Sequence, residues 1–216
     1  MNAVIKLIKK EIVLEFRQRF ALNGLLLYLF GILMMLYVSF METEAMTWTV
    51  LFWIIVFFTS INATAKSFSL ESQNRFLYYY SLVKPQHLIA AKMIYNALLL
   101  FGLSLVTWLF YSLILGDYII HKKIFLLTLF FGAVSIASLL SLMSAIAAKS
   151  GNSSTVMSIL SLPVLIPVLL LLIKITLYSV ETAQVAFPYR DVLFLFILNL
   201  MMGILAYVLF PYIYHD

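Results

Sequence analysis

Apolar residues fall into six long runs along this chain, separated by shorter polar stretches. The runs cover residues 21–41, 47–65, 93–115, 124–148, 155–178 and 192–212. A helix needs about 20 consecutive apolar residues to cross the hydrocarbon core of a bilayer. The pattern therefore predicts an all-α integral membrane protein with six transmembrane helices in a single domain, residues 1–216.

The first 20 or so residues do not form such a run, because charged residues recur every few positions. Ile5, Ile8 and Ile12 follow the spacing of one helical face. This pattern is typical of an amphipathic helix that lies in the membrane interface, with its lysines near lipid headgroups. A signal peptide is the competing interpretation, but acidic residues such as Glu11 interrupt the apolar stretch that it would need.

The longest polar interruption, residues 67–92, lies between the second and third runs. It holds charged or titratable side chains, three consecutive tyrosines and a proline: Glu71, Arg75, Tyr78, Tyr79, Tyr80, Lys84, Pro85, His87 and Lys92. Because runs of spanning length flank this segment, we expect it to lie in water or at the membrane surface.

Lysine and arginine residues set the expected orientation, since they gather in cytoplasmic loops. With both termini in the cytoplasm, most of the 14 basic residues lie inside, and Lys122, Lys123, Lys174 and Arg190 lie outside. Segment 67–92 is then the largest cytoplasmic loop.

Composition supports membrane integration and removes several function classes. The chain is 64% hydrophobic and 11% charged, with a mean hydropathy of +1.07, whereas an ordinary soluble domain is about 25% charged. It has no cysteine, which excludes thiolate metal sites and cysteine nucleophiles. The net charge of +5 is explained by basic loops, so we expect no nucleic-acid partner.

Known transport and protease machinery is missing from the apolar runs. No phosphate-binding loop of the G-x-x-x-x-G-K-[ST] type occurs, so ATP hydrolysis by that mechanism requires another polypeptide. No run interior holds the Asp or Glu of an ion-coupled transporter, or the His of an intramembrane serine protease. Polar residues such as Asn96, Thr107 and Asn199 more often bond a neighbouring helix.

Two features of the runs and loops indicate function. Pro163 and Pro167 should bend or loosen the fifth helix, either as a static kink or as a helix that changes shape during transport. On the outer side, His121 and Tyr118 are candidate contacts for an outward-moving ligand, although loop histidines are usually only solvated. No metal site is expected from the histidine spacing.

The order of these parts resembles an ABC-2-type exporter permease, and more narrowly the haem exporter protein B (CcmB) family of bacterial cytochrome c maturation. The most specific stretches are MSILSLPVLIPVLLL (157–171), LGDY (115–118) and LIAAKMIYN (88–96). The resemblance implies a multi-pass protein of the bacterial inner membrane that has no catalytic site and binds no cofactor stably. Haem would be a transported or handled ligand.

The resemblance also implies partners: a separate ABC ATPase subunit (CcmA-like), a haem-handling membrane subunit (CcmC-like) and, indirectly, a periplasmic haem chaperone (CcmE-like). Phe68, Glu71, Arg75, Tyr78 and Tyr79 would form a coupling helix that docks on the ATPase. The alternative is an interfacial helix anchored in the bilayer by its aromatic residues.

Other functions stay open at this point. The chain could be a non-transporting scaffold for cytochrome assembly, or an ABC-2 permease for another lipophilic substrate. Since six helices enclose only a narrow pathway, we expect two transmembrane units to pair, as a homodimer or with another subunit.

Overall fold

The computed structural model describes residues 2–17, 19–40, 43–69, 85–147, 153–180 and 187–215. Over these residues the chain forms helices joined by short connections, and the all-α prediction is confirmed. The helices are α1 (Asn2–Arg17), α2 (Arg19–Ser39), α3 (Ala45–Ser69), α5 (Pro85–Leu115), α6 (Lys122–Ala147), α7 (Ser153–Val180) and α8 (Tyr189–His215).

Five of these helices, α3 and α5 to α8, are long and apolar enough to cross a membrane. They contain or closely match the expected spans from 47–65 to 192–212. The apolar part of α2 that the structure describes, Asn23–Ser39, is shorter than such a span. Five spans are therefore supported by length and composition, and the sixth, 21–41, stays a prediction.

The polar segment 67–92 is more helical at its ends than the sequence pattern indicated. Residues 67–69 belong to the last turn of α3, and α5 begins at Pro85, well before the expected start of the third span at Met93. Proline is favoured in the first turn of a helix, where its missing N–H has no partner to lose. The rest of the segment, 70–84, lies outside the described residues.

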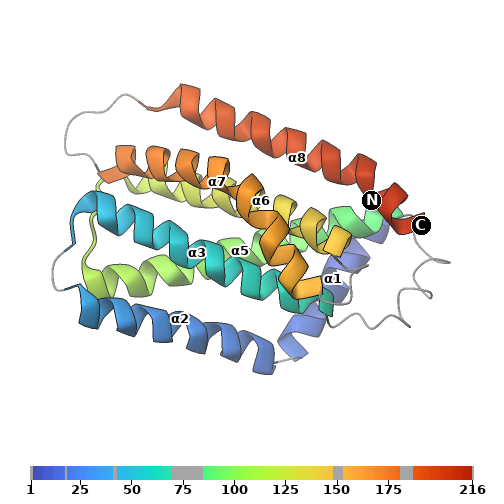
Figure 1. Ribbon diagram of the computed structural model, residues 1–216, viewed down its shortest axis with the longest axis horizontal. Coiled ribbons are helices and arrows are strands. Elements are labelled where there is room, and N and C mark those ends of the chain that lie inside the picture. Colours follow the sequence, from blue (N-terminus) through green and yellow to red (C-terminus); the bar gives the residue numbers. More distant parts are fainter. Residues whose placement is uncertain are drawn as a thin grey trace.

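Helices α2, α3 and α5 to α8 run side by side in an elongated bundle (Figure 1). Both chain termini lie at one end of the bundle, together with the end of α3 and the beginning of α5. The ends of α2, α5 and α7 and the beginnings of α3, α6 and α8 lie at the other end. This placement agrees with the predicted topology, in which these two sets of segments are on opposite sides of the membrane.

The expected amphipathic helix at the N-terminus is present as α1, which crosses the terminal end of the bundle obliquely (Figure 1). It packs against α5 and α2. Leu7 and Glu11 are buried on this side, whereas Ile5 and Val13 are more than half exposed. The apolar residues of α1 are therefore divided between the bundle and the outside.

Helix α6 lies at the centre and contacts α3, α5, α7 and α8. In its most apolar stretch 67% of the residues are buried, against 17% in the peripheral helix α8. Small side chains on the buried part of α6 explain this position, because they let neighbouring helices approach closely. They are Gly132, Ala133, Ser135, Ala137, Ser138, Ser141, Ser144, Ala145 and Ala147.

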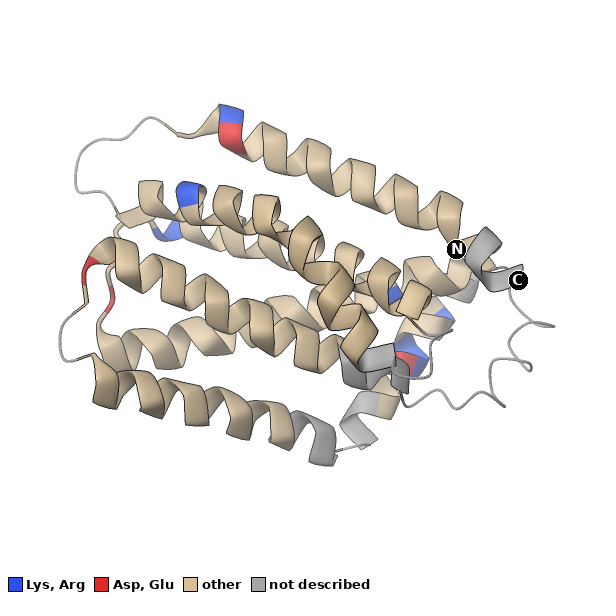
Figure 2. Ribbon diagram, viewed as in Figure 1, with Lys and Arg blue, Asp and Glu red and all other residues tan. Residues whose placement is uncertain are grey.

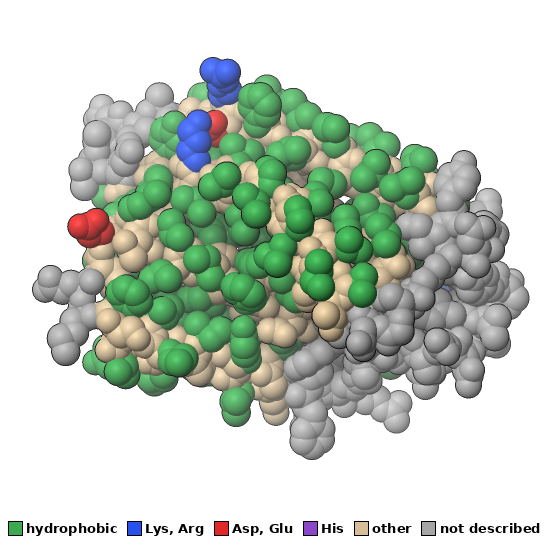
Figure 3. All heavy atoms as spheres, viewed as in Figure 1, with side chains coloured by type: hydrophobic (Ala, Val, Ile, Leu, Met, Phe, Trp, Pro, Cys, Tyr) green, Lys and Arg blue, Asp and Glu red, His purple; other side chains and the backbone are tan. Residues whose placement is uncertain are grey.

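The outer surface of the bundle fits a lipid environment. Hydrophobic side chains cover the face shown in Figure 3. The charged residues that are coloured in Figure 2 lie toward the two ends of the bundle and leave its middle uncharged. A belt of this kind avoids the cost of placing charge in hydrocarbon.

Candidate functional site

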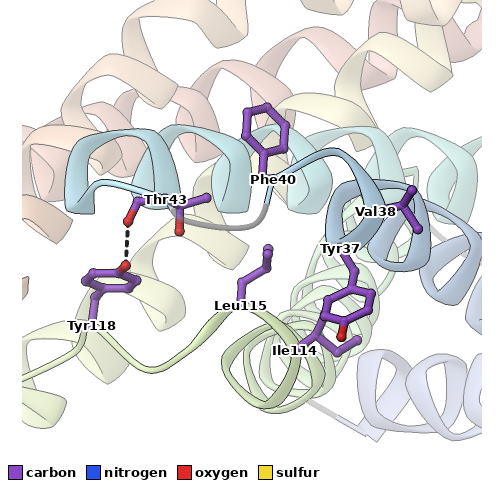
Figure 4. A pocket seen from close by; sticks show the side chains of 7 residues that line it. All are labelled: Tyr37, Val38, Phe40, Thr43, Ile114, Leu115 and Tyr118. Carbon is purple, nitrogen blue, oxygen red and sulfur yellow. Dashed lines mark hydrogen bonds between the residues drawn. The ribbon is translucent and has the colours of Figure 1, made fainter.

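A pocket of about 540 Å³ lies at the end of the bundle opposite to the termini. It is formed by the end of α2, the α2–α3 connection and the segment that ends α5. The lining residues are Tyr37, Val38, Phe40, Thr43, Ile114, Leu115 and Tyr118, shown in Figure 4. Its volume is within the range of pockets that hold small organic ligands, about 300–1,000 Å³.

The position of Tyr118 in this pocket is fixed by a hydrogen bond. Its hydroxyl donates to the main-chain carbonyl oxygen of Thr43, which ties the α5–α6 connection to the α2–α3 connection (Figure 4). Thr43 itself is only 9% exposed, and its side-chain hydroxyl has no partner in the part of the chain that the structure describes. One residue of the pocket lining thus carries a buried polar atom without a partner among the described residues.

His121, which we grouped with Tyr118 from the sequence, does not line the pocket. Its backbone N–H and that of Ile120 both donate to the carbonyl oxygen of Ser179, each at 2.9 Å. These bonds hold the α5–α6 connection against the end of α7. The structure therefore places the two predicted ligand contacts in different surroundings.

An aromatic cluster that sequence reasoning did not single out lies beside Tyr118, whose ring centroid is 6.1 Å from that of Trp48. Trp48 stacks on Phe52 with ring centroids 5.6 Å apart, and its centroid lies 4.8 Å from that of Tyr111. The Trp48 indole N–H donates to the carbonyl oxygen of Gly116 at 3.0 Å. The Tyr111 hydroxyl in turn donates to the Trp48 carbonyl oxygen at 3.0 Å.

These bonds join the start of α3 to the end of α5. Gly116 has a φ of 87°, a left-handed conformation that glycine adopts without a steric penalty. The glycine turn aims its carbonyl at Trp48 and lets the chain continue to Tyr118. A signal for this arrangement exists in the sequence as Gly116 at the end of an apolar run.

An ion pair joins α7 and α8 at the same end of the bundle. Lys174 Nζ lies 2.8 Å from Asp191 Oδ1, in the first turn of α8. The lysine side chain is 58% exposed and that of the aspartate 12%. The sequence assigned Lys174 to the outer side of the membrane, and the carboxylate that it meets was not predicted.

Both predicted kink residues, Pro163 and Pro167, lie inside α7 on an exposed part of its surface. They are four positions apart and so lie on one face. The α7 ribbon changes direction part-way along its length in Figure 1. Each proline removes an N–H from the helical ladder, which accounts for a bend in this helix.

Polar side chains inside the bundle form hydrogen bonds to other groups of the bundle. The Asn96 side-chain amide donates to Ser141 Oγ at 2.9 Å, and that of Asn199 donates to the Phe131 carbonyl oxygen at 3.3 Å. These two bonds cross between helices, as expected. The Thr107 hydroxyl instead donates to Leu103 in its own helix.

Two ionisable groups near the opposite end of the bundle are more buried than the sequence suggested. Lys92, expected at the edge of the polar loop, lies inside α5 and is 1% exposed. Glu11 on α1 is 8% exposed and lies 3.1 Å from the Lys10 ammonium group. Helix α1 therefore covers this end of α5 with charged as well as apolar side chains.

Of the five predicted ATPase contacts, one lies in a described helix. Phe68 lies in the last turn of α3. Glu71, Arg75, Tyr78 and Tyr79 lie outside the described residues. Among the described residues no group of His, Asp or Glu side chains is arranged to hold a metal ion.

Comparison with protein families connects these observations. The model of the CcmB protein family matches residues 2–213, nearly the whole chain. The chain belongs to the CcmB family. A search of curated proteins finds no sequence match.

Membership in the CcmB family and the apolar helices together make this chain a multi-pass membrane component of haem export and cytochrome c maturation. Family members are membrane permease subunits. The match runs from α1 into α8, so it includes the α1 helix, the pocket and both prolines of α7.

Proposed function

We propose that this CcmB-family chain is the permease subunit of an ABC-type haem exporter complex in the bacterial inner membrane, with both termini in the cytoplasm. A separate ATPase subunit drives the complex. The observation that carries the proposal is the family match over residues 2–213 in a chain that has no nucleotide-binding loop of its own.

In this proposal six helices cross the membrane, with α2 as the sixth span beside the five helices that have spanning length. The end of α3 and the beginning of α5 face the cytoplasm together with the termini. The ATPase therefore meets the permease at the end of the bundle where segment 70–84 joins these two helices.

The proposed mechanism is mechanical. Closure of the ATPase subunits moves the coupling segment, including Glu71 and Arg75, and this displaces α3 and α5. Helix α7 follows through its contacts with α3 and α6. Its two prolines allow it to change its bend without breaking a complete ladder of backbone hydrogen bonds. A CcmC-like subunit handles haem, a CcmE-like chaperone receives it, and two transmembrane units pair.

The first test determines which proteins and ligands are purified together with this chain. The tagged chain is purified in mild detergent, and the eluate is examined by mass spectrometry and by haem absorbance. We expect an ABC ATPase subunit and a haem-handling membrane subunit. Recovery of an ATPase without haem or its handlers would contradict the haem assignment but retain a permease.

The second test separates a permease from a passive scaffold. The complex is purified with Glu71→Lys or Arg75→Glu in this chain. The ATPase activity and the subunit stoichiometry of each variant complex are then measured. We expect the complex to remain assembled while coupling of ATP hydrolysis to the membrane subunit is lost. The matched control is Lys123→Glu, an exposed charge reversal at the other end of the bundle. Unchanged ATPase coupling in all three variants would favour the scaffold.

A further inference from the structure

The pocket at the α2–α3 connection has a chemistry that the proposed transport role does not explain. Among the residues that the structure describes, seven side chains line it and none of them carries a charge. Its walls are aliphatic and aromatic, with three hydroxyl groups, on Tyr37, Thr43 and Tyr118. The described part of the lining therefore favours a mostly apolar ligand, because none of these side chains neutralises a charged group.

One of these hydroxyl groups has no hydrogen-bond partner among the described residues. The Tyr118 hydroxyl is used by its bond to the Thr43 carbonyl oxygen. The Thr43 side-chain hydroxyl is buried and has no partner among the described residues. In Figure 4 it points into the space between Tyr118 and Leu115. A buried hydroxyl without a partner is unfavourable, so an acceptor atom from a ligand would stabilise it.

The position of the pocket along the bundle identifies the source of that acceptor. It lies where α2 and α5 end and α3 begins, at Ser39, Leu115 and Ala45. The ends of spanning helices lie at the boundary between hydrocarbon and headgroups, where tyrosine is enriched. Glycerol ester carbonyls of phospholipids occupy the same depth and are uncharged hydrogen-bond acceptors.

We propose that this pocket binds one membrane phospholipid through its uncharged part. An ester carbonyl accepts a hydrogen bond from the Thr43 hydroxyl. The acyl chain lies against Val38, Ile114 and Leu115, and the headgroup stays outside the pocket. The exposed position of Val38, at 79%, and of Tyr37, at 57%, leaves the rim open toward the surrounding bilayer.

The uncharged side chains of the described lining distinguish this ligand from two others. Haem carries two carboxylates, which require cations or water, and an anionic lipid would require a basic rim. Lys122, at the start of α6, does not line the pocket and lies 4.0 Å from the Asp117 carboxylate. The pocket therefore selects for an acyl chain and its ester, and not for a charged headgroup.

A bound lipid would complete the packing of α2. Among the described residues α2 packs against α1, α3 and α5, and its buried face is a stripe of Leu25, Leu29 and Leu33. The stripe continues at Leu36, which packs against the core, and the next residue, Tyr37, is 57% exposed and lines the pocket. The lipid fills the space that remains between α2 and the end of α5.

The test is lipid binding by the purified, delipidated full-length chain. Palmitoyl-oleoyl phosphatidylethanolamine is titrated in and bound lipids are counted by native mass spectrometry. Thr43→Val keeps the side-chain shape and removes the hydroxyl, and Leu115→Trp fills the pocket. We expect about a fivefold weaker affinity for Thr43→Val and loss of the tightest bound lipid for Leu115→Trp.

Matched controls are Thr128→Val and Leu113→Trp. The Thr128 hydroxyl already bonds Ile124 in its own helix, and Leu113 is 74% exposed and does not line the pocket. Both should bind lipid as the wild type does. Size-exclusion profiles verify that each variant is folded. If Leu115→Trp fails this check, the shape-conserving Thr43→Val decides the result.

Three results would overturn the proposal. One is equal lipid retention by the wild type, Thr43→Val and Leu115→Trp. Another is strong preference for phosphatidylglycerol over phosphatidylethanolamine, which would mean that a charged headgroup is bound. The third is displacement of the lipid by haem in a way that depends on Thr43, which would assign the pocket to the cargo. None of these results affects the proposed permease role.

Discussion

Gly132 of α6 lies so close to Trp53 of α3 that a β-carbon added to the glycine would stand 2.7 Å from the indole ring. The same β-carbon would stand 3.1 Å from a methyl group of Leu172 in α7. Three helices therefore meet at a point where only glycine fits. Close helix contacts of this kind are a main source of stability in membrane proteins, where lipid removes the hydrophobic drive for helices to associate.

Replacement of this glycine should loosen the bundle. We expect Gly132→Ala to lower the free energy of unfolding by about 1–3 kcal/mol, because Trp53 is rigid and buried and cannot move away. The measurement is thermal unfolding in detergent. Gly102→Ala and Gly203→Ala are controls, since a β-carbon at either position meets no atom within 4 Å. Equal effects at all three positions would refute the close contact.

A buried hydrogen bond between α3 and α7 should be measurable by a double-mutant cycle. The Trp53 indole N–H donates to Thr176 Oγ1 at 2.9 Å, and the Thr176 hydroxyl donates to Leu172. Thr176→Val leaves a buried indole N–H unpaired and should cost about 1–3 kcal/mol. Trp53→Phe loses the bond and ring contacts. A coupling energy near zero between the two substitutions would contradict the bond.

The turn at Gly116 should tolerate few side chains. Its φ of 87° is left-handed, and an added β-carbon would meet only Tyr118, at 3.9 Å. The cost of Gly116→Ala is therefore conformational, about 1–2 kcal/mol, and not steric. We expect Gly116→Asn to unfold at a higher temperature than Gly116→Ala, since asparagine enters this region more easily. The reverse order of the two variants would show that φ is not the constraint.

The ion pair between α7 and α8 should respond asymmetrically to mutation. Asp191 is nearly buried, whereas Lys174 is largely exposed. Lys174→Met leaves a buried carboxylate without its cation, which is strongly unfavourable. Asp191→Asn leaves an exposed ammonium group that can reach the interface. Lys174→Met should therefore lower the unfolding temperature more than Asp191→Asn does. Equal shifts in the two variants would argue against burial of the Asp191 carboxylate.

Substitution of the two prolines of α7 should distinguish a static kink from a helix that changes its bend during transport. Pro163→Ala and Pro167→Ala each restore a backbone N–H and should raise the unfolding temperature by a few degrees. If the helix changes its bend during transport, ATP-driven turnover of the complex should fall. Pro211→Ala, in α8, is the control for turnover. Higher stability with unchanged turnover would support the static kink.

Membrane integration, helix positions and family could be predicted from the sequence because each depends on local patterns. A run of about 20 apolar residues is a membrane span whatever it packs against. Charges end such runs, so the predicted bounds of 124–148 nearly coincide with α6. The start of α5 was missed because Pro85, His87 and Lys92 look like a loop, and burial of Lys92 depends on other helices.

The site could be predicted only in part, for a physical reason. Spanning helices are apolar on all sides, since lipid and protein interior favour the same residues, so the sequence does not show which side faces inward. Tyr118 was identified because it stands in a polar connection, but Thr43 and Trp48 gave no signal. The pairing of Trp53 with Thr176 joins residues 123 positions apart.

By itself, then, the sequence determined that the chain enters the membrane, where its helices lie and which family it resembles. Only the tertiary structure decided that Gly132 must accommodate Trp53, that Lys174 meets Asp191 and that Thr43 faces a pocket. These outcomes follow from the rotation and approach of whole helices. Close contacts between small and polar side chains set both, and no local pattern of hydrophobicity encodes them.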